Sequence, residues 1–316
     1  MPPSLHRPTA KMLPPPPPSI HFKKVDYRLN RTYTNGLSPV GHYVPPVEDA
    51  SNHIAVKYFN HRASPTLPGM AENAFKIWKN VRSQLLAVGF PDYHAWNPRY
   101  QITEHVSGED LEDVCGQKCD LLITEIRHLL LSIIPHVGAM IDAGVVHGDI
   151  KAGNIIVNEG HLPAPNWSVR IIDLDSMRHA GHDSDDVFGT PYFMAPEVAR
   201  GTYAATSDVF SLSMLALDLL CSERYPETLG EPILSGASQK NQKALFVARS
   251  FGYVFYPDAR KYLEKMLIPR AENCRPELRQ ILDFIFLCGS IDPAARPQTG
   301  QEMTEVLTGS TGRSEA

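Results

Sequence analysis

The part of this chain that most constrains its fold and chemistry lies near the middle, where polar residues follow an apolar run. It reads Val145-Val146-His147-Gly148-Asp149-Ile150-Lys151-Ala152-Gly153-Asn154. Two apolar runs follow, Ile155 to Val157 and Val169 to Ile172, and the second leads directly into Asp173-Leu174-Asp175. The runs are typical of two short strands on either side of a turn-rich segment. Two acids and an amide are therefore expected at strand ends.

The side chains at these strand ends are of the types that in-line phosphoryl transfer requires. The reaction needs a carboxylate to orient the attacking hydroxyl, oxygen ligands to hold magnesium on the phosphates, and a cation to offset developing charge. Asp149 can supply the carboxylate and Lys151 the cation, while Asn154 and Asp173 can supply the metal ligands. These four residues therefore predict a magnesium-dependent phosphotransferase site, with Mn²⁺ as an alternative metal.

The same residues carry a resemblance to a known family. His147 to Asn154 resembles the catalytic loop of eukaryotic-type protein kinases, and Asp173-Leu174-Asp175 stands where that family has its Asp-Phe-Gly magnesium motif. Downstream, Gly189 to Glu197 resembles the end of the activation segment, Ser207 to Leu212 the buried helix beneath it, and Asp292 to Pro297 the closing motif. The order and spacing of these matches make the resemblance specific.

The resemblance covers roughly residues 25 to 307 and implies an α+β, bilobal protein-kinase-like fold, with a small strand-rich N-lobe and a larger, mainly helical C-lobe. Apolar periodicity predicts a strand at 53–59 and helices at 70–86, 120–143, 207–221 and 277–287. The expected boundaries are a disordered proline-rich extension at 1–20, the N-lobe at 21–103, the hinge at 104–108, the C-lobe at 109–307 and a disordered tail at 308–316.

The resemblance also implies a set of nucleotide-binding residues. Lys57, in His53-Ile54-Ala55-Val56-Lys57, resembles the strand lysine that pairs with ATP phosphates, although a surface lysine on an edge strand is the alternative. Glu72 is the candidate for the helix glutamate that holds this lysine. Around Glu104 and Val106 the chain resembles the hinge that receives adenine through backbone groups.

Three departures from the family pattern bear on activity. The segment Leu29 to Gly36 replaces the glycine-rich phosphate loop with almost no glycine, so close backbone approach to phosphate is in doubt. Gly148 stands where many kinases have arginine, which removes the usual partner of an activation-segment phosphate. Asp175 replaces the glycine of the magnesium motif and is expected to alter metal preference more than to abolish catalysis.

The expected function is ATP-dependent phosphorylation of Ser or Thr in protein substrates, without need for activation-loop phosphorylation. Lys151, two residues after Asp149, and Thr190 in the Gly-Thr-Pro segment resemble the Ser/Thr branch. Two alternatives stay open. The altered phosphate loop allows a pseudokinase scaffold, and the His-Gly-Asp loop also resembles aminoglycoside and choline kinase-like phosphotransferases, which act on small molecules.

Several polar residues are expected to support the site without taking part in the reaction. His147 is expected to brace the catalytic loop, because Asp149 is the better placed proton acceptor. Asp208 is expected to bond to the backbone of that loop, and Glu197 is expected to form a buried ion pair with Arg296. The loss of one partner of such a pair costs about 3 to 5 kcal/mol.

Composition limits the expected partners. The net charge of -5, with 30 basic and 35 acidic side chains and no long basic block, favours neither nucleic acid nor a membrane surface as a partner. Five cysteines without zinc-ligand spacing indicate a reducing compartment, so we expect an intracellular, cytoplasmic protein, with the nucleus as the alternative location. The oligomeric state is not indicated by the sequence.

Overall fold

The computed structural model describes residues 15–34, 38–46, 52–61, 64–117, 121–158, 168–183, 187–221, 259–267 and 274–310. The chain divides into two compact units. The first unit runs to Asn80 and includes Pro91–Val106, and the second comprises Val81–Phe90 and the chain from Ser107 onward. The change after Val106 falls within 104–108, the segment that the sequence assigns to the hinge. The elements form the α+β arrangement that the resemblance implies, with a strand-rich first unit and a mainly helical second unit.

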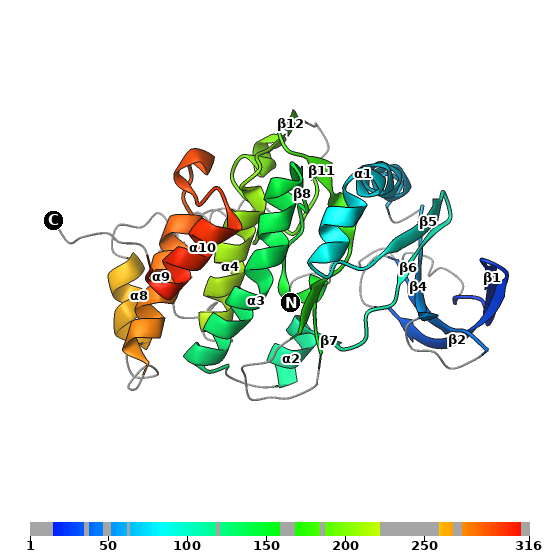
Figure 1. Ribbon diagram of the computed structural model, residues 1–316, viewed down its shortest axis with the longest axis horizontal. Coiled ribbons are helices and arrows are strands. Elements are labelled where there is room, and N and C mark those ends of the chain that lie inside the picture. Colours follow the sequence, from blue (N-terminus) through cyan, green and yellow to red (C-terminus); the bar gives the residue numbers. More distant parts are fainter. Residues whose placement is uncertain are drawn as a thin grey trace, which may run out of the picture. The chain divides into compact units, whose positions relative to one another are not determined.

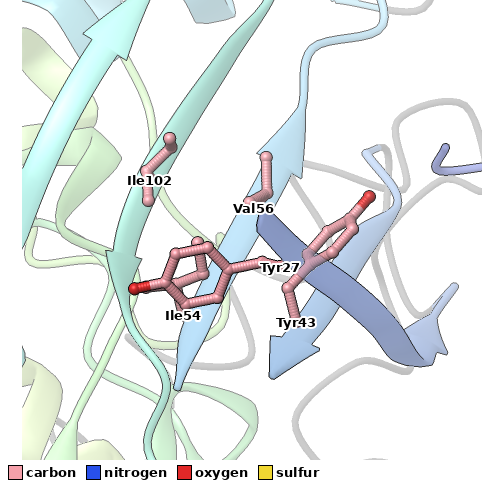
Figure 2. Close-up of a cluster of buried hydrophobic side chains, with 5 residues drawn as sticks. All are labelled: Tyr27, Tyr43, Ile54, Val56 and Ile102. Carbon is pink, nitrogen blue, oxygen red and sulfur yellow. The ribbon is translucent and has the colours of Figure 1, made fainter. Parts of the chain in front are cut away.

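The first unit is built on a six-stranded antiparallel sheet in the order β1-β2-β3-β4-β6-β5. Its strands are Ser19–Phe22 (β1), Val25–Tyr33 (β2), Val40–Val44 (β3), Ile54–Tyr58 (β4), Tyr93–Asn97 (β5) and Tyr100–Glu104 (β6). Successive side chains of a strand point to opposite faces of a sheet. One face therefore gathers the buried residues that Figure 2 shows, which are Tyr27, Tyr43, Ile54, Val56 and Ile102.

The sheet begins earlier in the chain than the sequence suggested. Ser19 and Ile20 belong to β1, although they fall within the extension expected to be disordered, and Tyr43 Oη donates a hydrogen bond to the carbonyl of Pro17 at 2.9 Å. A polyproline segment has no internal hydrogen bonds, so this side-chain donor satisfies one of its carbonyls. Ordered structure in the first unit therefore reaches back at least to this proline.

Helix α1 (Leu67–Ala87) begins in the first unit and ends in the second. Its spacing of apolar residues buries one face, on which Trp78 is fully buried and its ring centroid lies 5.4 Å from that of Tyr93 in β5. The helix spans the segment 70–86 that periodicity predicts, with three further residues before it and one after.

The second unit is mainly helical. Its helices are α2 (Leu111–Gln117), α3 (Ile123–Asp142), α4 (Ser207–Cys221), α8 (Ala259–Leu267), α9 (Arg275–Cys288) and α10 (Gly300–Thr308). Short strands accompany them at Glu109–Asp110 (β7), Val145–Val146 (β8), Ile155–Val157 (β9), Val169–Ile171 (β10), Arg178–His179 (β11), His182–Asp183 (β12) and Thr202–Tyr203 (β13). Among the described residues, no helix combines the length and the apolar character needed to cross a membrane.

Helix α3 forms the centre of this unit and contacts α4, α9 and α10, which lie beside it (Figure 1). It starts at Ile123 because Glu125 accepts a hydrogen bond from the backbone N–H of Leu122 at 2.8 Å. The helix continues through Pro135 and is followed by Gly144, whose φ of 65° is favourable only for glycine and a few polar residues. The α3 segment predicted at 120–143 is therefore correct to within a few residues.

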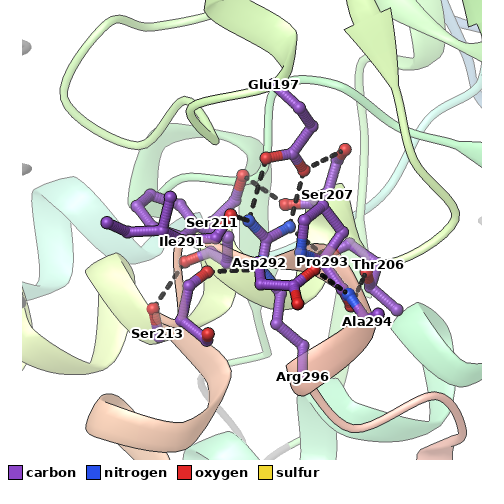
Figure 3. Close-up of polar contacts among 12 residues, drawn as sticks. Glu197, Thr206, Ser207, Ser211, Ser213, Ile291, Asp292, Pro293, Ala294 and Arg296 are labelled. Carbon is purple, nitrogen blue, oxygen red and sulfur yellow. Dashed lines mark hydrogen bonds and ion pairs between the residues drawn. The ribbon is translucent and has the colours of Figure 1, made fainter.

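A buried ion pair joins distant parts of the second unit, as the sequence predicts. Arg296 Nη1 and Nη2 donate to the two carboxylate oxygens of Glu197 at 2.6 and 2.8 Å (Figure 3). The Arg296 side chain is fully buried, and its remaining donors are used by the carbonyls of Ser290 at 2.8 Å and Thr206 at 3.1 Å. Ser207 Oγ also donates to Glu197 at 2.8 Å. A buried charge pair is stable in this form because its hydrogen-bonding groups have partners.

Arg296→Ala is expected to lower the free energy of unfolding by about 3 to 5 kcal/mol, because it leaves the carboxylate of Glu197 buried and without its cation. The measurement is urea unfolding followed by circular dichroism. Arg260→Ala is the matched control, since Arg260 lies 2.7 Å from Asp283 but is 40% exposed, and an exposed pair contributes up to about 1 kcal/mol. Equal losses in the two variants would contradict the structural role of Arg296.

Candidate active site

A β-hairpin brings the two predicted metal ligands together. Strands β9 and β10 pair antiparallel, with Ile155 opposite Ile171, and the N–H of Ile172 donates to the carbonyl of Asn154 at 2.9 Å. Asn154 immediately precedes β9, and Asp173 follows the end of β10 by two residues. Because the strands run in opposite directions, both side chains lie at the same end of the hairpin.

The carboxylate of Asp149 is surrounded by hydrogen-bond donors. One oxygen, Oδ1, accepts from the backbone N–H and the hydroxyl of Thr190, both at 2.8 Å. The other oxygen, Oδ2, lies 2.8 Å from Lys151 Nζ and 3.0 Å from Asn154 Nδ2. Lys151 Nζ also donates to Thr190 Oγ1 at 2.8 Å. Asp149, Lys151 and Asn154 therefore share one hydrogen-bond network. Donors from the catalytic loop and from Thr190 fix the orientation of the Asp149 carboxylate.

The backbone around Asp149 is held by buried side chains. The N–H groups of His147 and Gly148 donate to the two carboxylate oxygens of Asp208 at 2.6 and 3.0 Å. His147 accepts from the N–H of Asp149 at its Nδ1, so its Nε2 carries the proton and donates to the carbonyl of Ile172 at 3.1 Å. These contacts confirm the predicted bracing roles of Asp208 and His147. Burial raises the pKa of Asp208 above its usual value, and the two N–H donors act in the opposite direction.

The Asp-Leu-Asp motif has an unusual backbone. Asp173 adopts φ 65° and ψ 62°, a left-handed conformation that is uncommon outside glycine and that occurs preferentially at functional sites. Asp175 is 3% exposed and lies in the 3₁₀ helix Leu174–Ser176. Among the described residues, the non-glycine positions with positive φ are Lys23, Lys24 and Asp173. The aspartate that replaces the family glycine is therefore accommodated without a left-handed backbone.

Two glycines make the catalytic loop and the activation segment fit together. Gly148, the residue in place of the family arginine, has φ 81°, and a Cβ atom there would lie 3.2 Å from the carbonyl oxygen of Ser176. Gly189 has φ 127°, and its Cβ would lie 2.5 Å from the carbonyl oxygen of Gly148. The absence of side chains at both positions thus allows Thr190 to reach Asp149.

The donor set at the end of the hairpin fits a magnesium ion. Mg²⁺ prefers carboxylate and carbonyl oxygens. Asn154 is 5% exposed, and its amide nitrogen donates both to the carbonyl and to the carboxylate of Asp149, which leaves its amide oxygen as the group available to a cation. The chemistry of these groups fits the predicted metal ligands, and metal binding by Asn154 and Asp173 stays a prediction.

Of the predicted nucleotide-binding residues, Asp173 lies in the second unit, and Lys57, Glu72, Glu104 and Val106 lie in the first. Lys57 is on β4, between β3 and β6, and pairs with Val40 and Gln101. Because β4 is an interior strand, the alternative of a lysine on an edge strand is wrong. Glu72 lies near the start of α1, and its carboxylate is 2.8 Å from Lys76 Nζ on the same helix. The expected pairing of Glu72 with Lys57 remains a prediction.

The hinge candidates extend the ladder between β4 and β6. Glu104 pairs with Ile54, its N–H donates to the carbonyl of Asp92 at 2.7 Å, and the N–H of His105 donates to the carbonyl of His53 at 3.0 Å. Val106 is half-buried just beyond them. Adenine recognition by Glu104 and Val106 stays a prediction. In the glycine-poor phosphate loop, residues up to Tyr33 belong to β2, whereas Asn35 and Gly36 lie outside the described residues.

Thr190 is the site residue whose contact the sequence did not reveal. The sequence used it as a mark of the Ser/Thr branch, but the structure shows its hydroxyl between Asp149 and Lys151. The available signal was its place after Gly189 in the Gly-Thr-Pro segment. A contact between residues 41 positions apart does not follow from local periodicity.

The fold and this constellation define the chain as a protein kinase domain. The family described as the protein kinase domain matches residues 46–307, so the chain belongs to this family.

Named relatives agree with the Ser/Thr branch. The chain is 29% identical over 182 residues to calcium/calmodulin-dependent protein kinase type 1 of Macrobrachium nipponense, which covers 57% of this chain and 51% of that protein. It is 24% identical over 263 residues to serine/threonine-protein kinase 33 of Mus musculus, covering 79% and 52% respectively. It is 24% identical over 213 residues to probable serine/threonine-protein kinase zyg-1 of Caenorhabditis briggsae, covering 67% and 29%. The chain thus spans about half or less of the length of these relatives.

Gly189→Ala tests the close approach between the two segments. Its Cβ would lie 2.5 Å from a backbone oxygen, whereas the Cβ of Gly181→Ala, at φ 76°, would meet nothing within 4 Å. Left-handed backbone strain costs an ordinary residue about 1 to 2 kcal/mol. Gly181→Ala is therefore expected to lower the free energy of unfolding by that amount, and Gly189→Ala is expected to lower it by more. Urea unfolding of both variants measures the difference. Equal losses of unfolding free energy would show that the carbonyl oxygen of Gly148 does not exclude a side chain at position 189.

Proposed function

We propose that this chain is an ATP-dependent protein kinase that transfers the γ-phosphate to Ser or Thr of protein substrates. The observation that carries the proposal is the network on Asp149, in which Lys151, Asn154 and Thr190 hold one carboxylate. Membership of the protein kinase domain family supports it, as do the names of the Ser/Thr kinases that the chain resembles.

In this mechanism Asp149 orients the substrate hydroxyl and accepts its proton. The hydroxyl oxygen forms a bond to the γ-phosphorus, and the bond between that phosphorus and the bridging oxygen of ADP breaks. Lys151, which lies 2.8 Å from Asp149, offsets negative charge on the transferring group. Thr190 keeps the carboxylate in place through two hydrogen bonds, so the base does not have to be ordered during the reaction.

The remaining predicted residues bind the nucleotide and metal. Asn154 and Asp173 would hold the divalent cation, for which we propose Mg²⁺ with Mn²⁺ as a substitute, and the cation would supply positive charge against the phosphates. Lys57 contacts the phosphates and is held by Glu72, which exchanges its partner Lys76 for Lys57. Backbone groups of Glu104 and Val106 receive adenine.

We further propose that activity does not require phosphorylation of the activation segment. The family arginine that pairs with such a phosphate is replaced by Gly148, whose positive φ disfavours a side chain there. Thr190 and Lys151 already connect the segment to Asp149 through neutral and cationic donors. The catalytic carboxylate is therefore ordered by contacts that need no phosphate.

Asp149→Asn is expected to abolish phosphate transfer while nucleotide binding persists, because the amide cannot accept the hydroxyl proton. The assay follows label from γ-labelled ATP into a mixture of generic protein substrates, with Mg²⁺ and separately with Mn²⁺.

Wild-type protein treated with phosphatase beforehand should keep its activity.

The assay distinguishes the alternatives. Retained turnover in Asp149→Asn would contradict the role of Asp149, and loss of wild-type turnover after phosphatase treatment would contradict independence from phosphorylation. If wild type transfers no label but is stabilised against heat by ATP and metal, the chain is a nucleotide-binding scaffold or acts on small molecules.

A further inference from the structure

Three histidines gather on one face of the sheet in the first unit. His53 precedes β4 by one residue and His105 follows β6 by one residue, and the backbone bond between them continues the ladder. His42, on β3, pairs with Ala55, which is two residues from His53. Alternation along the strands places all three rings on the face that also carries Lys57, opposite the buried cluster of Figure 2.

The ring nitrogens of this histidine cluster are close enough to share a metal ion. His42 Nε2 lies 3.1 Å from His53 Nδ1, and one ligand atom from each of the three rings lies within 4.8 Å of the others. Ligands of a tetrahedral zinc ion with Zn–N bonds of about 2.0 to 2.1 Å are about 3.3 Å apart. The three ring nitrogens are therefore near the separation that a three-nitrogen site needs, and side-chain rotation would complete it.

Neighbouring polar side chains contact one ring nitrogen of each of two histidines. Asn30 Nδ2 lies 3.3 Å from His42 Nδ1, and Tyr33 Oη lies 3.4 Å from His105 Nε2. In metal sites the non-ligating nitrogen of a histidine donates to such a group, and a turn of the Asn30 amide would present its oxygen to His42. On His105 the other nitrogen, Nδ1, is buried and has no hydrogen-bond partner among the described residues.

The rings are also in the form that binds metal. Neutral imidazole is the ligand form of histidine. Burial lowers the pKa of His42 to about 4, with smaller contributions from His53 and Arg31. Burial likewise lowers the pKa of His105 to about 4, with contributions from the other two histidines. Neither ring therefore has to give up an extra proton at neutral pH.

One feature of the metal-free arrangement must change on binding. The rings of His42 and His105 are stacked, with centroids 3.6 Å apart and planes at 7°. A metal lies near the plane of each imidazole that binds it, so at least one of these rings has to rotate out of the stack. His105 is half-buried at the end of its strand and can turn more readily than His42, which is 7% exposed within β3.

We propose that His42, His53 and His105 form a binding site for a divalent transition metal of the zinc class, with a fourth position open to water or another ligand. Imidazole nitrogens favour zinc, copper and nickel, whereas magnesium favours oxygen. The site is therefore chemically distinct from Asn154 and Asp173, and Zn²⁺ binding to it can be measured whether or not the chain is an active kinase. Because His105 lies between Glu104 and Val106, the metal would be held directly at the segment expected to receive adenine.

The test uses the full chain, stripped of metal with a chelator and dialysed. Zn²⁺ is titrated by calorimetry in excess Mg²⁺ without nucleotide, and Co²⁺ is added separately to record its visible absorption. We expect one Zn²⁺ per chain at this site and an intense absorption typical of four-coordinate Co²⁺. His53→Gln and His105→Gln should each weaken binding about tenfold or more, and Asn30→Ala, which removes no ligand, should also weaken it.

The matched control is His21→Gln, which changes an exposed histidine on the same sheet that pairs with Asp26 and lies outside the histidine cluster. It should leave Zn²⁺ affinity unchanged. The proposal is overturned if wild type does not bind Zn²⁺, or if His53→Gln and Asn30→Ala bind it as tightly as wild type does. Failure of wild type to bind Zn²⁺ overturns the proposal whether or not the variants fold.

Discussion

The buried carboxylate of Asp208 is the contact on which the catalytic part of the second unit depends. It lies at the start of α4, is 1% exposed, and accepts the N–H groups of both His147 and Gly148. With these two amides fixed, His147 can receive the N–H of Asp149 and donate to Ile172, next to Asp173. One buried side chain therefore sets the positions of the base and, through the hairpin, of the metal ligands. Burying a carboxylate without hydrogen-bond partners is costly, so these two N–H donors are what allow the charged side chain to lie here.

Much of this part of the fold could be predicted from the sequence because its signals are local. Helix α4 occupies the predicted residues 207–221, and β9 occupies the predicted residues 155–157. The ion pair between Glu197 and Arg296 followed from family resemblance. The bonds of Thr190 to Asp149 and Lys151 did not, because they join separate loops and depend on the left-handed backbone of Gly189.

The first unit shows the same limit of sequence reasoning. The strand around Lys57 was predicted from its apolar run, but its interior place in the sheet depends on pairing with β3 and β6. The histidine cluster was missed because its members lie in β3 and next to β4 and β6, far apart in the sequence, and become neighbours only through strand register. Glu72 was chosen as an acid near a helix start, and the structure shows that Lys76, four residues on, is its neighbour.

The central claim is that Thr190 fixes the carboxylate of Asp149 for phosphate transfer. The most direct measurement is the steady-state kinetics of Thr190→Val and Thr190→Ser with one protein substrate and varied ATP. The valine variant keeps the shape but loses the hydroxyl that Asp149 and Lys151 share. The account predicts a kcat about tenfold to a hundredfold lower for valine, an unchanged KM for ATP, and near wild-type kcat for serine. A wild-type kcat in the valine variant would contradict it.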